Sequence, residues 1–140
     1  MKKFNEELEI FKDIYNSAWG KNWGFVPMTN AEIDYMAEKL KPVVVPELIT
    51  LIEVAGKPAA VALVVPNFNE VLIKLNGKLG PIEILKFLYY KNKIKDTRFM
   101  ALGVKNEYHG KGLNAIMMME AFDVAKKLGY KGGELSWTLE

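Results

Sequence analysis

A glycine-containing turn at residues 107–114 holds the groups of this sequence that are best suited to chemistry. The strand-like run 99–104 precedes it, and a run with apolar residues at helical spacing, from Leu113 to Leu128, follows it. Because glycine has no Cβ, the backbone N–H groups of such a turn can approach a phosphate closely, and the positive end of the helix dipole favours negative charge. We therefore expect this turn to bind a pyrophosphate. A turn that only links a strand to a helix can have the same residue types.

Two common nucleotide-binding motifs can be compared with this turn. A Walker-type loop requires glycine where this sequence has Lys105, so that motif is absent. Residues 110–115 do match Gly-x-Gly-x-x-Gly/Ala, the dinucleotide fingerprint, and residues 133–137 provide the following strand. In that fingerprint, however, the acidic residue lies at the far end of the second strand, whereas Glu134 lies at its near end. A dinucleotide-binding fragment therefore stays an alternative.

Residues 102–113 resemble the acyl-CoA-binding motif of the GNAT superfamily of N-acetyltransferases. In that family a strand, an Arg/Gln-x-x-Gly-x-Gly/Ala turn and a helix bind the cofactor pyrophosphate. Residues 18–29 and 133–140 also resemble segments of an uncharacterised bacterial GNAT-like family, so that the resemblance covers nearly the whole chain. It implies acetyl-CoA or CoA as the cofactor. The residues that would bind this cofactor are Leu102, Gly103, Val104, His109, Gly110, Lys111, Gly112, Leu113 and Asn114.

The turn departs from the family motif at two positions. His109 stands where the motif usually has Arg or Gln, and Asn114 occupies the position of the last Gly or Ala. Histidine is mostly neutral at pH 7, and asparagine is bulkier than alanine. Both departures bear on how tightly the cofactor would be held.

The resemblance implies direct transfer of an acetyl or other acyl group from CoA to an unidentified amine, on a small molecule or a peptide. A carboxylate or a water must then remove the amine proton. Glu134 and Glu107 are the carboxylates nearest the turn in sequence, and the Tyr108 phenol could donate a proton. Each has an ordinary alternative, as a solvated surface charge or a packed anchor of the turn. A non-catalytic CoA-binding or protein-interaction module with the same fold is the competing interpretation.

The composition limits the function classes. A length of 140 residues with 50% hydrophobic content suits one domain, 1–140, with its own core. With no cysteine and a single histidine, thiolate metal sites and thiol nucleophiles are excluded, and we expect no metal. A net charge of +2 gives no reason to expect a nucleic-acid partner. No apolar run is long enough for a membrane span and no signal peptide is visible, so we expect a cytoplasmic protein without a membrane partner.

The predicted elements are pairs of helices and strands. An amphipathic helix over residues 4–18 is followed by a second that begins at the capping box Thr29–Glu32. Runs 48–54 and 58–65 predict an antiparallel hairpin whose second arm, without polar alternation, is a central strand covered on both faces. Helices then follow at 68–75, ending at Gly77, and from Pro81 onwards. With the GNAT resemblance, these elements predict an α/β fold of the α+β type, a mixed central sheet flanked by helices.

Two stretches allow two interpretations each. The aromatic loop at residues 19–27 either seals one end of the core or lines a site for an apolar acceptor. The basic residues between Lys86 and Arg98 form either a solvated helix face or an electrostatic guide for an anionic ligand.

The chain ends early for the fold that it resembles. GNAT domains continue past the strand that follows the acyl-CoA-binding helix, so we expect the C-terminal part of the fold to be missing and the chain to be a fragment. Residues 135–139 alternate apolar and polar side chains, which gives the last strand an apolar face and a free edge. We therefore expect a homo-oligomer formed through this edge, unless the aromatic loop covers it.

Overall fold

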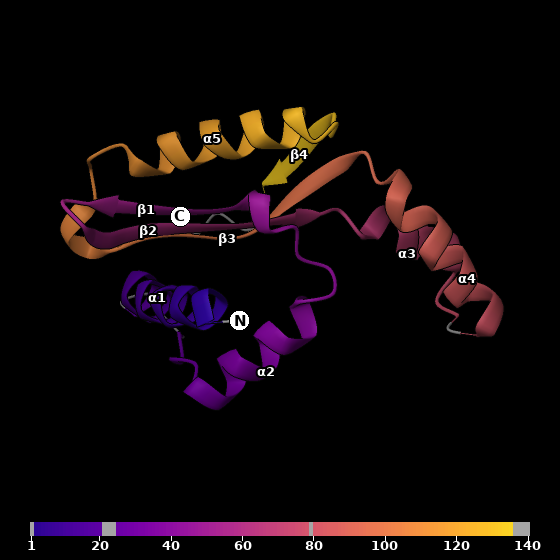
Figure 1. Cartoon of the computed structure of the whole chain (residues 1–140), viewed down its shortest axis with the longest axis horizontal. Coiled ribbons are helices and arrows are strands. Elements are labelled where there is room, and N and C mark those ends of the chain that lie inside the picture. Colours follow the sequence, from indigo (N-terminus) through magenta and orange to yellow (C-terminus); the bar gives the residue numbers. More distant parts are fainter. Residues whose placement is uncertain (1, 21–24, 79, 136–140) are drawn as a thin grey trace.

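The computed structural model describes residues 2–20, 25–78 and 80–135, and in these ranges the chain forms five α-helices and a four-stranded sheet (Figure 1). The helices and strands are, in chain order, α1 Lys2–Trp19, α2 Asn30–Leu40, β1 Ile49–Val54, β2 Lys57–Pro66, α3 Asn69–Leu75, α4 Pro81–Tyr90, β3 Asp96–Val104, α5 Leu113–Lys127 and β4 Gly132–Leu135. The predicted α+β class with a mixed sheet and flanking helices is confirmed.

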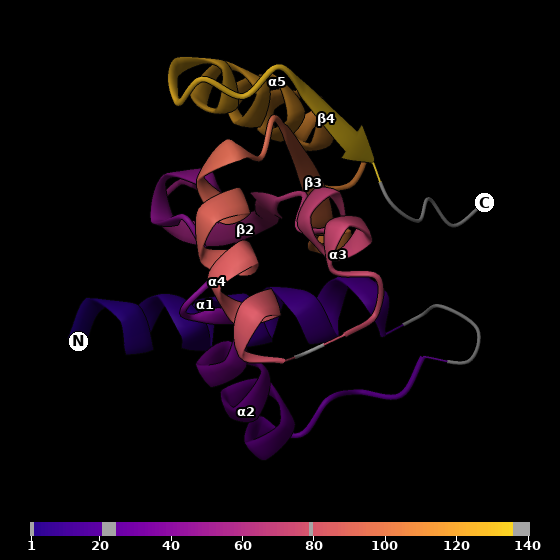
Figure 2. The ribbon, with the colours of Figure 1, turned by 90° about the vertical axis from the view of Figure 1, so that its right-hand side faces the viewer.

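The sheet has the order β1-β2-β3-β4, with β2 antiparallel to both β1 and β3, and β3 parallel to β4. Every residue of β2 from Ala59 to Pro66 is buried. Helix α5 covers one face of the sheet, and α1 covers the other with α2 beneath it (Figures 1 and 2). The prediction of a central strand covered on both faces is therefore confirmed.

The core between α5 and the sheet is formed by small and medium side chains at helical spacing. Met117, Ala121 and Ala125 of α5 face the sheet and are buried together with Val64 and Phe99. The alanines allow close approach of the helix to the strands. Met117, which is fully buried, fills the space between the helix and the sheet. This packing fixes where the turn before α5 leaves the end of β3.

A buried lysine joins the two helices on the other face. The Lys12 ammonium is 2.6 Å from a carboxylate oxygen of Glu9 and 2.8 Å from one of Asp34, and the residue is only 6% exposed. The hydrogen bond to Asp34, and then the one to Glu9, raises the pKa of Lys12. The helical periodicity could not predict the pairing with Asp34, because Asp34 lies on another helix.

The connection between β2 and β3 forms a helical hairpin that projects from one end of the sheet (Figure 1). Residues 67–95 leave the sheet and return to it, although Pro66 and Thr97 are paired opposite one another in the sheet. Both predicted helices are present here as α3 and α4. The residue that ends α3 is Asn76, in the left-handed conformation, and Gly77 follows it with φ +71°.

The terminal strand β4 is described only as far as Leu135, and all four of its residues are exposed. The prediction of an oligomer edge depends on residues 135–139, and positions 136–140 lie outside the described residues. That prediction therefore stays untested.

The capping box of α2 is confirmed by its hydrogen bonds. The Glu32 N–H donates to the Thr29 hydroxyl oxygen (3.3 Å), while the Thr29 backbone N–H and hydroxyl each donate to Glu32 Oε2 (2.8 Å). The backbone N–H, and then the hydroxyl, lowers the pKa of Glu32.

We predict that Thr29→Ala lowers the free energy of unfolding by about 1 kcal/mol, because an orphan helix N–H loses its acceptor. Since the folded-state pKa of Glu32 is lowered, the ionised carboxylate stabilises the fold above its ordinary pKa, and this contribution is lost as the pH falls through the lowered value. The free energies of unfolding of wild type and Glu32→Gln, measured with urea, should therefore differ at pH 7 and become equal in acid. Glu38→Gln, at an exposed carboxylate on the same helix, is the control; a constant difference between wild type and Glu32→Gln at all pH values would contradict the prediction.

Candidate functional site

The turn between β3 and α5 has an open backbone. Gly110 and Gly112 both have φ +74°, and a Cβ built at either position would meet no heavy atom within 4 Å. Gly112 is the N-cap of α5, and the first helical bond runs from the Ile116 N–H to its carbonyl (3.2 Å). The N–H groups of residues 113–115 therefore precede the first helical bond, as at any helix start. The geometry combines free space, glycine conformations and a helix N-terminus at one place.

The end of β3 next to this turn presents backbone groups on one edge. The Lys105 N–H donates to the Ala59 carbonyl of β2 (2.9 Å), and the register continues with Gly103 opposite Val61. In an antiparallel ladder, alternate residues bond to the same neighbour, so the polar backbone groups of Leu102 and Val104 point away from β2. Among the described residues, the parallel pairing of β3 with β4 ends at Phe99 and Leu135. The edge at Leu102 and Val104 therefore lies beyond this pairing.

His109 is directed back toward this edge. Its Nε2 lies 2.9 Å from the Val104 carbonyl oxygen. Because a carbonyl can only accept, Nε2 carries the proton and donates. The bond closes the turn onto the end of β3, so a phosphate contact from His109 would have to come from Nδ1 or follow a rotation of the ring.

Tyr108 and Lys111 stabilise the turn from its inner and outer sides. Tyr108 is 9% exposed and packs in the core cluster with Val104 and Leu113. Burial raises the pKa of its phenol, and Glu107 raises it further, so the phenol keeps its proton near neutral pH. The Lys111 ammonium lies 4.9 Å from the centre of the Tyr108 ring, within cation–π range. The ring of Tyr108 thus anchors the turn.

The two candidate carboxylates are not brought together. Glu107 is exposed within the turn itself. Glu134 lies opposite Arg98 in the sheet, with an oxygen 3.7 Å from that guanidinium and a second oxygen that accepts from the Asn67 amide (3.4 Å). Arg98 precedes Val104 by six positions, which is about 20 Å along a strand at 3.3 Å per residue. Glu134 therefore lies far from the glycine turn.

Two contacts that the sequence did not reveal tie the turn to α1. The Lys105 ammonium pairs with Asp13 at 2.6 Å, and the Asn106 side-chain amide donates to the Ser17 carbonyl (3.1 Å). Both partners are distant in sequence, so no local pattern could have indicated these contacts. They hold the start of the turn against the last two turns of α1.

Trp19 packs on the face of β3 opposite to α5. A Cβ at Gly103 would lie 2.6 Å from the Trp19 ring and 3.1 Å from the Ala18 Cβ. The Trp19 ring contacts that of Tyr15 at 4.5 Å between centroids, and Tyr15 also contacts Phe25 at 5.9 Å. For Trp19 and Phe25 this supports the interpretation that the aromatic loop seals the core; Trp23 lies outside the described residues.

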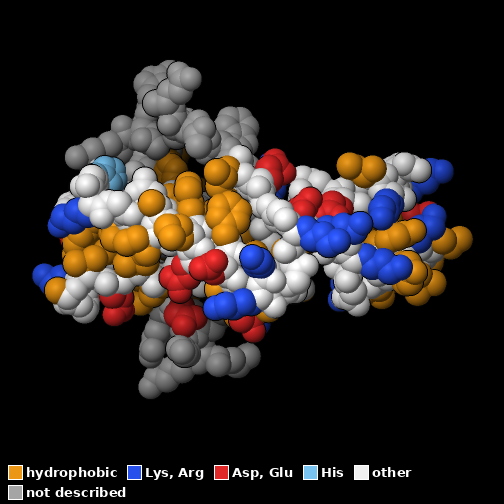
Figure 3. All heavy atoms as spheres, turned by 90° about the horizontal axis from the view of Figure 1, so that it is seen from above, with side chains coloured by type: hydrophobic (Ala, Val, Ile, Leu, Met, Phe, Trp, Pro, Cys, Tyr) orange, Lys and Arg blue, Asp and Glu red, His pale blue; other side chains and the backbone are white. Residues whose placement is uncertain are grey.

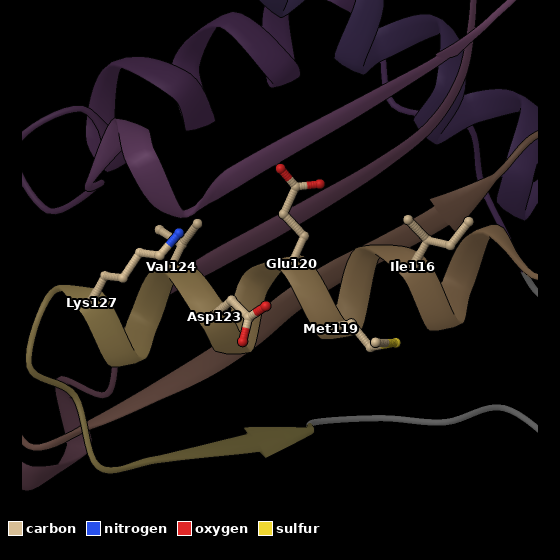
Figure 4. Close-up of a pocket in the computed structure, with 6 residues that line it drawn as sticks. All are labelled: Ile116, Met119, Glu120, Asp123, Val124 and Lys127. Carbon is tan, nitrogen blue, oxygen red and sulfur yellow. The ribbon is translucent and has the colours of Figure 1, made fainter.

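A shallow depression on α5 does not coincide with the turn (Figure 4). All of its lining residues belong to this one helix, and none is a predicted site residue. They are Ile116, Met119, Glu120, Asp123, Val124 and Lys127. The depression therefore does not define the candidate site.

In the part of the chain that the structure describes, no group of three or more His, Cys, Asp or Glu side chains could hold a metal ion. None of the described helices is both long enough and apolar enough to cross a membrane.

Comparison with protein-family models gives no match. Two curated bacterial relatives align with the chain over nearly all its length. "Bacterial ceramide synthase" of Caulobacter vibrioides is 38% identical over 146 residues, and "Protein YghO" of Escherichia coli K12 is 34% identical over 144 residues. The alignments cover 100% and 99% of this chain but only 38% and 37% of the relatives. The chain thus spans well under half the length of these proteins.

Solved structures of N-acetyltransferases have the same arrangement of elements. AAC(6')-Iy, in complex with the bisubstrate analogue CoA-S-monomethyl-acetylneamine, superposes with a TM-score of 0.62 at 9% identity over 96% of this chain and 76% of its own. Polyamine N-acetyltransferase of Drosophila melanogaster gives 0.60 at 14% identity, over 96% and 73%. The chain has the GNAT fold. In this chain β3, the glycine turn and α5 follow one another as the strand, turn and helix that the sequence predicted.

We predict that Gly103→Ala lowers the free energy of unfolding by about 1–3 kcal/mol, because the added methyl group overlaps the Trp19 ring. The matched test is a double-mutant cycle with Trp19→Leu, which removes the ring that the methyl would meet. Gly103→Ala should cost clearly less in the Trp19→Leu background. Equal costs in both backgrounds, measured by denaturant unfolding, would contradict this account of the contact.

Proposed function

We propose that this chain is an acyl-CoA-dependent N-acyltransferase domain, which transfers an acyl group from CoA to an amine. The observation that carries the proposal is the open glycine turn between β3 and α5 in a fold shared with N-acetyltransferases. Acyl transfer in general is supported by these structural relatives; use of CoA by this chain is our inference.

The residues at the turn fit a CoA-type ligand. The free space beside Gly110 and Gly112 leaves room for a pyrophosphate against the backbone, and the N–H groups of residues 113–115 supply donors. The N–H and carbonyl of Leu102 and the N–H of Val104 offer strand-like pairing to the amide-bearing pantetheine arm, whereas the Val104 carbonyl already accepts from His109. When bound, acyl-CoA supplies the activated acyl group as a thioester. Lys111 adds positive charge near the phosphates.

The names of two relatives suggest two classes of amine for the acceptor. One relative is named as a ceramide synthase, and ceramide is an amide of a long-chain amino alcohol; one structural relative is named as a polyamine acetyltransferase. We infer that one of these two classes of amine is the acceptor. Removal of the amine proton would fall to a water or to Glu107, because Glu134 is paired with Arg98 far from the turn.

A non-catalytic CoA-binding module with the GNAT fold is the second candidate. The observation that favours it is the placement of the three candidate proton-transfer groups. Tyr108 is packed in the core and Glu134 is engaged elsewhere, which leaves only the exposed Glu107 beside the turn. Such a module would bind CoA without turnover, and a cytoplasmic location fits either candidate.

We predict that Gly112→Val abolishes CoA binding measured by calorimetry, because a branched side chain would block the approach of the pyrophosphate. A side chain at positive φ also strains the backbone, so the matched control is Gly77→Val. Gly77 has φ +71° and equal free space but lies in the distant α3–α4 connection, and this variant should bind CoA like wild type. Lys111→Ala should weaken binding by about 1 kcal/mol, as expected for an exposed charge contact. Equal CoA affinity in wild type and Gly112→Val would refute the site.

Turnover separates the two candidate functions. Because the chain has no cysteine, free CoA released from acetyl-CoA or a long-chain acyl-CoA can be followed with a thiol reagent without background from the protein. We expect release only when an amine is added, with either agmatine or a long-chain amino alcohol as the acceptor. CoA binding without amine-dependent release would support the module instead.

A further inference from the structure

The α3–α4 hairpin presents an apolar surface outward. It forms the separate lobe at the right of Figures 1 and 3, where apolar and lysine side chains lie together on the surface. Antiparallel strands can be joined by a turn of two residues, so the pairing of β2 with β3 does not itself require residues 67–95. The hairpin is therefore an addition to the sheet.

Helix α4 has most of its apolar residues on the side away from the protein. Its inner stripe is Glu83, Phe87 and Tyr90, at helical spacing, with the Phe87 ring 6.0 Å from that of Phe68 at the start of α3. No residue of α4 is buried. The large apolar side chains that the hairpin exposes are Leu72 (50%), Ile73 (75%), Ile82 (65%), Ile84 (56%), Leu85 (68%), Leu88 (48%) and Tyr89 (59%). An exposed apolar surface of this extent indicates a binding function.

The hairpin is also strongly basic. Residues 67–95 contain six lysines and two glutamates, a net charge of +4, whereas the whole chain has 19 − 17 = +2, so the remainder carries −2. Glu70 accepts hydrogen bonds from the backbone N–H groups of Lys95 (3.2 Å) and Asp96 (2.9 Å) at the base of the hairpin. It thus joins the two arms of the insertion. The lysines are Lys74, Lys78, Lys86, Lys91, Lys93 and Lys95.

Lysine and tyrosine side chains pair at the edges of the apolar surface. The Lys74 ammonium lies 4.3 Å from the Tyr90 ring centre and the Lys93 ammonium 4.0 Å from that of Tyr89. Lys93 also donates to the Tyr89 hydroxyl oxygen at 2.6 Å. Lysine stems that reach water past apolar surface, together with tyrosines, are typical of segments that lie at a lipid–water interface.

We propose that the α3–α4 hairpin docks this protein on the surface of an anionic lipid bilayer, with the exposed side of α4 in the headgroup region. Apolar contact and attraction between lysines and anionic headgroups act together in such binding. Six lysines on one hairpin disfavour packing of two copies through this surface, because like charges would be brought together. We expected no membrane partner because no apolar run is long enough for a span. That none of the described helices could cross a membrane does not bear on docking at a membrane surface. The inference does not depend on CoA binding.

Vesicle sedimentation of the full chain tests the proposal. We expect binding to vesicles of phosphatidylcholine with 30% phosphatidylglycerol, binding at least tenfold weaker to pure phosphatidylcholine, and weaker binding at high salt. Lys86→Gln with Lys91→Gln should lower the partition coefficient about 25-fold, at about fivefold per lysine. Ile84→Gln with Leu85→Gln should lower it at least tenfold. Because all four residues are exposed, circular dichroism should show an unchanged fold.

Matched variants on α5 control for general loss of apolar surface or charge. The exposed fractions of Ile116 and Met119, 51% and 68%, are similar to those of Ile84 and Leu85. Lys126 and Lys127 lie at the end of the same helix. Replacing either pair by glutamine should leave vesicle binding unchanged. Equal losses in the α4 and α5 variants, or no binding of the folded wild type to anionic vesicles, would overturn the proposal.

A second readout locates the contact. Because the chain has no cysteine, Leu85→Cys and Met119→Cys can each carry a single environment-sensitive fluorophore. On anionic vesicles the emission should shift to the blue at position 85 and not at position 119. Light scattering without lipid tests whether a second copy of the chain covers this surface instead. The double variant Ile84→Gln with Leu85→Gln would then dissociate a dimer of the wild type. Such a dimer, together with unshifted emission at position 85 on vesicles, would overturn the proposal.

Discussion

Burial of β2 on both faces is the constraint on which the rest of the structure depends. The strand has alanine and valine where a half-exposed strand would have polar residues, so both its faces must be covered for it to be stable. Helix α5 covers one face and α1 the other, which makes three layers out of a short chain. The strands beside β2 then have fixed positions, and β3, as its neighbour, carries the turn to a defined place at the edge of the core.

The register of β3 links the packing to the candidate site. Side chains alternate between the faces of a strand, and hydrogen-bonding groups alternate between its edges, with the same period. Gly103 faces Trp19 while its polar backbone groups bond to β2, which directs those of Leu102 and Val104 to the other edge. A slip of one residue would place a larger side chain against Trp19 and turn Gly103 to the open edge. The fit of glycine against tryptophan therefore helps to define which backbone groups a ligand can meet.

Local signals predicted much of this fold, and distant pairings could not be predicted. The capping box at Thr29, the proline at the start of α4 and the glycine turn each specify a local conformation, and all three are found where they were expected. The pairs Lys105–Asp13 and Asn106–Ser17, and the bond from His109 to Val104, arise only when β3 and α1 are packed together. For that reason the expectation that His109 substitutes for an arginine took no account of the carbonyl to which it donates. Periodicity predicts that a helix has an apolar stripe but not which surface the stripe packs against. In α4 most of the apolar residues are exposed.

The exposed side of α4 cannot be explained by the stability of the fold. Within the hairpin, Val71 and Leu75 are buried and Phe68 meets Phe87, so the contacts that hold the two helices lie on their inner sides. The outward isoleucines and leucines add apolar surface that water must solvate, and a polar residue at those positions would keep the helix without that cost. The lysines around them keep such a surface soluble. A surface that the fold does not need, and that combines apolar contact with positive charge, is best explained by something that it binds.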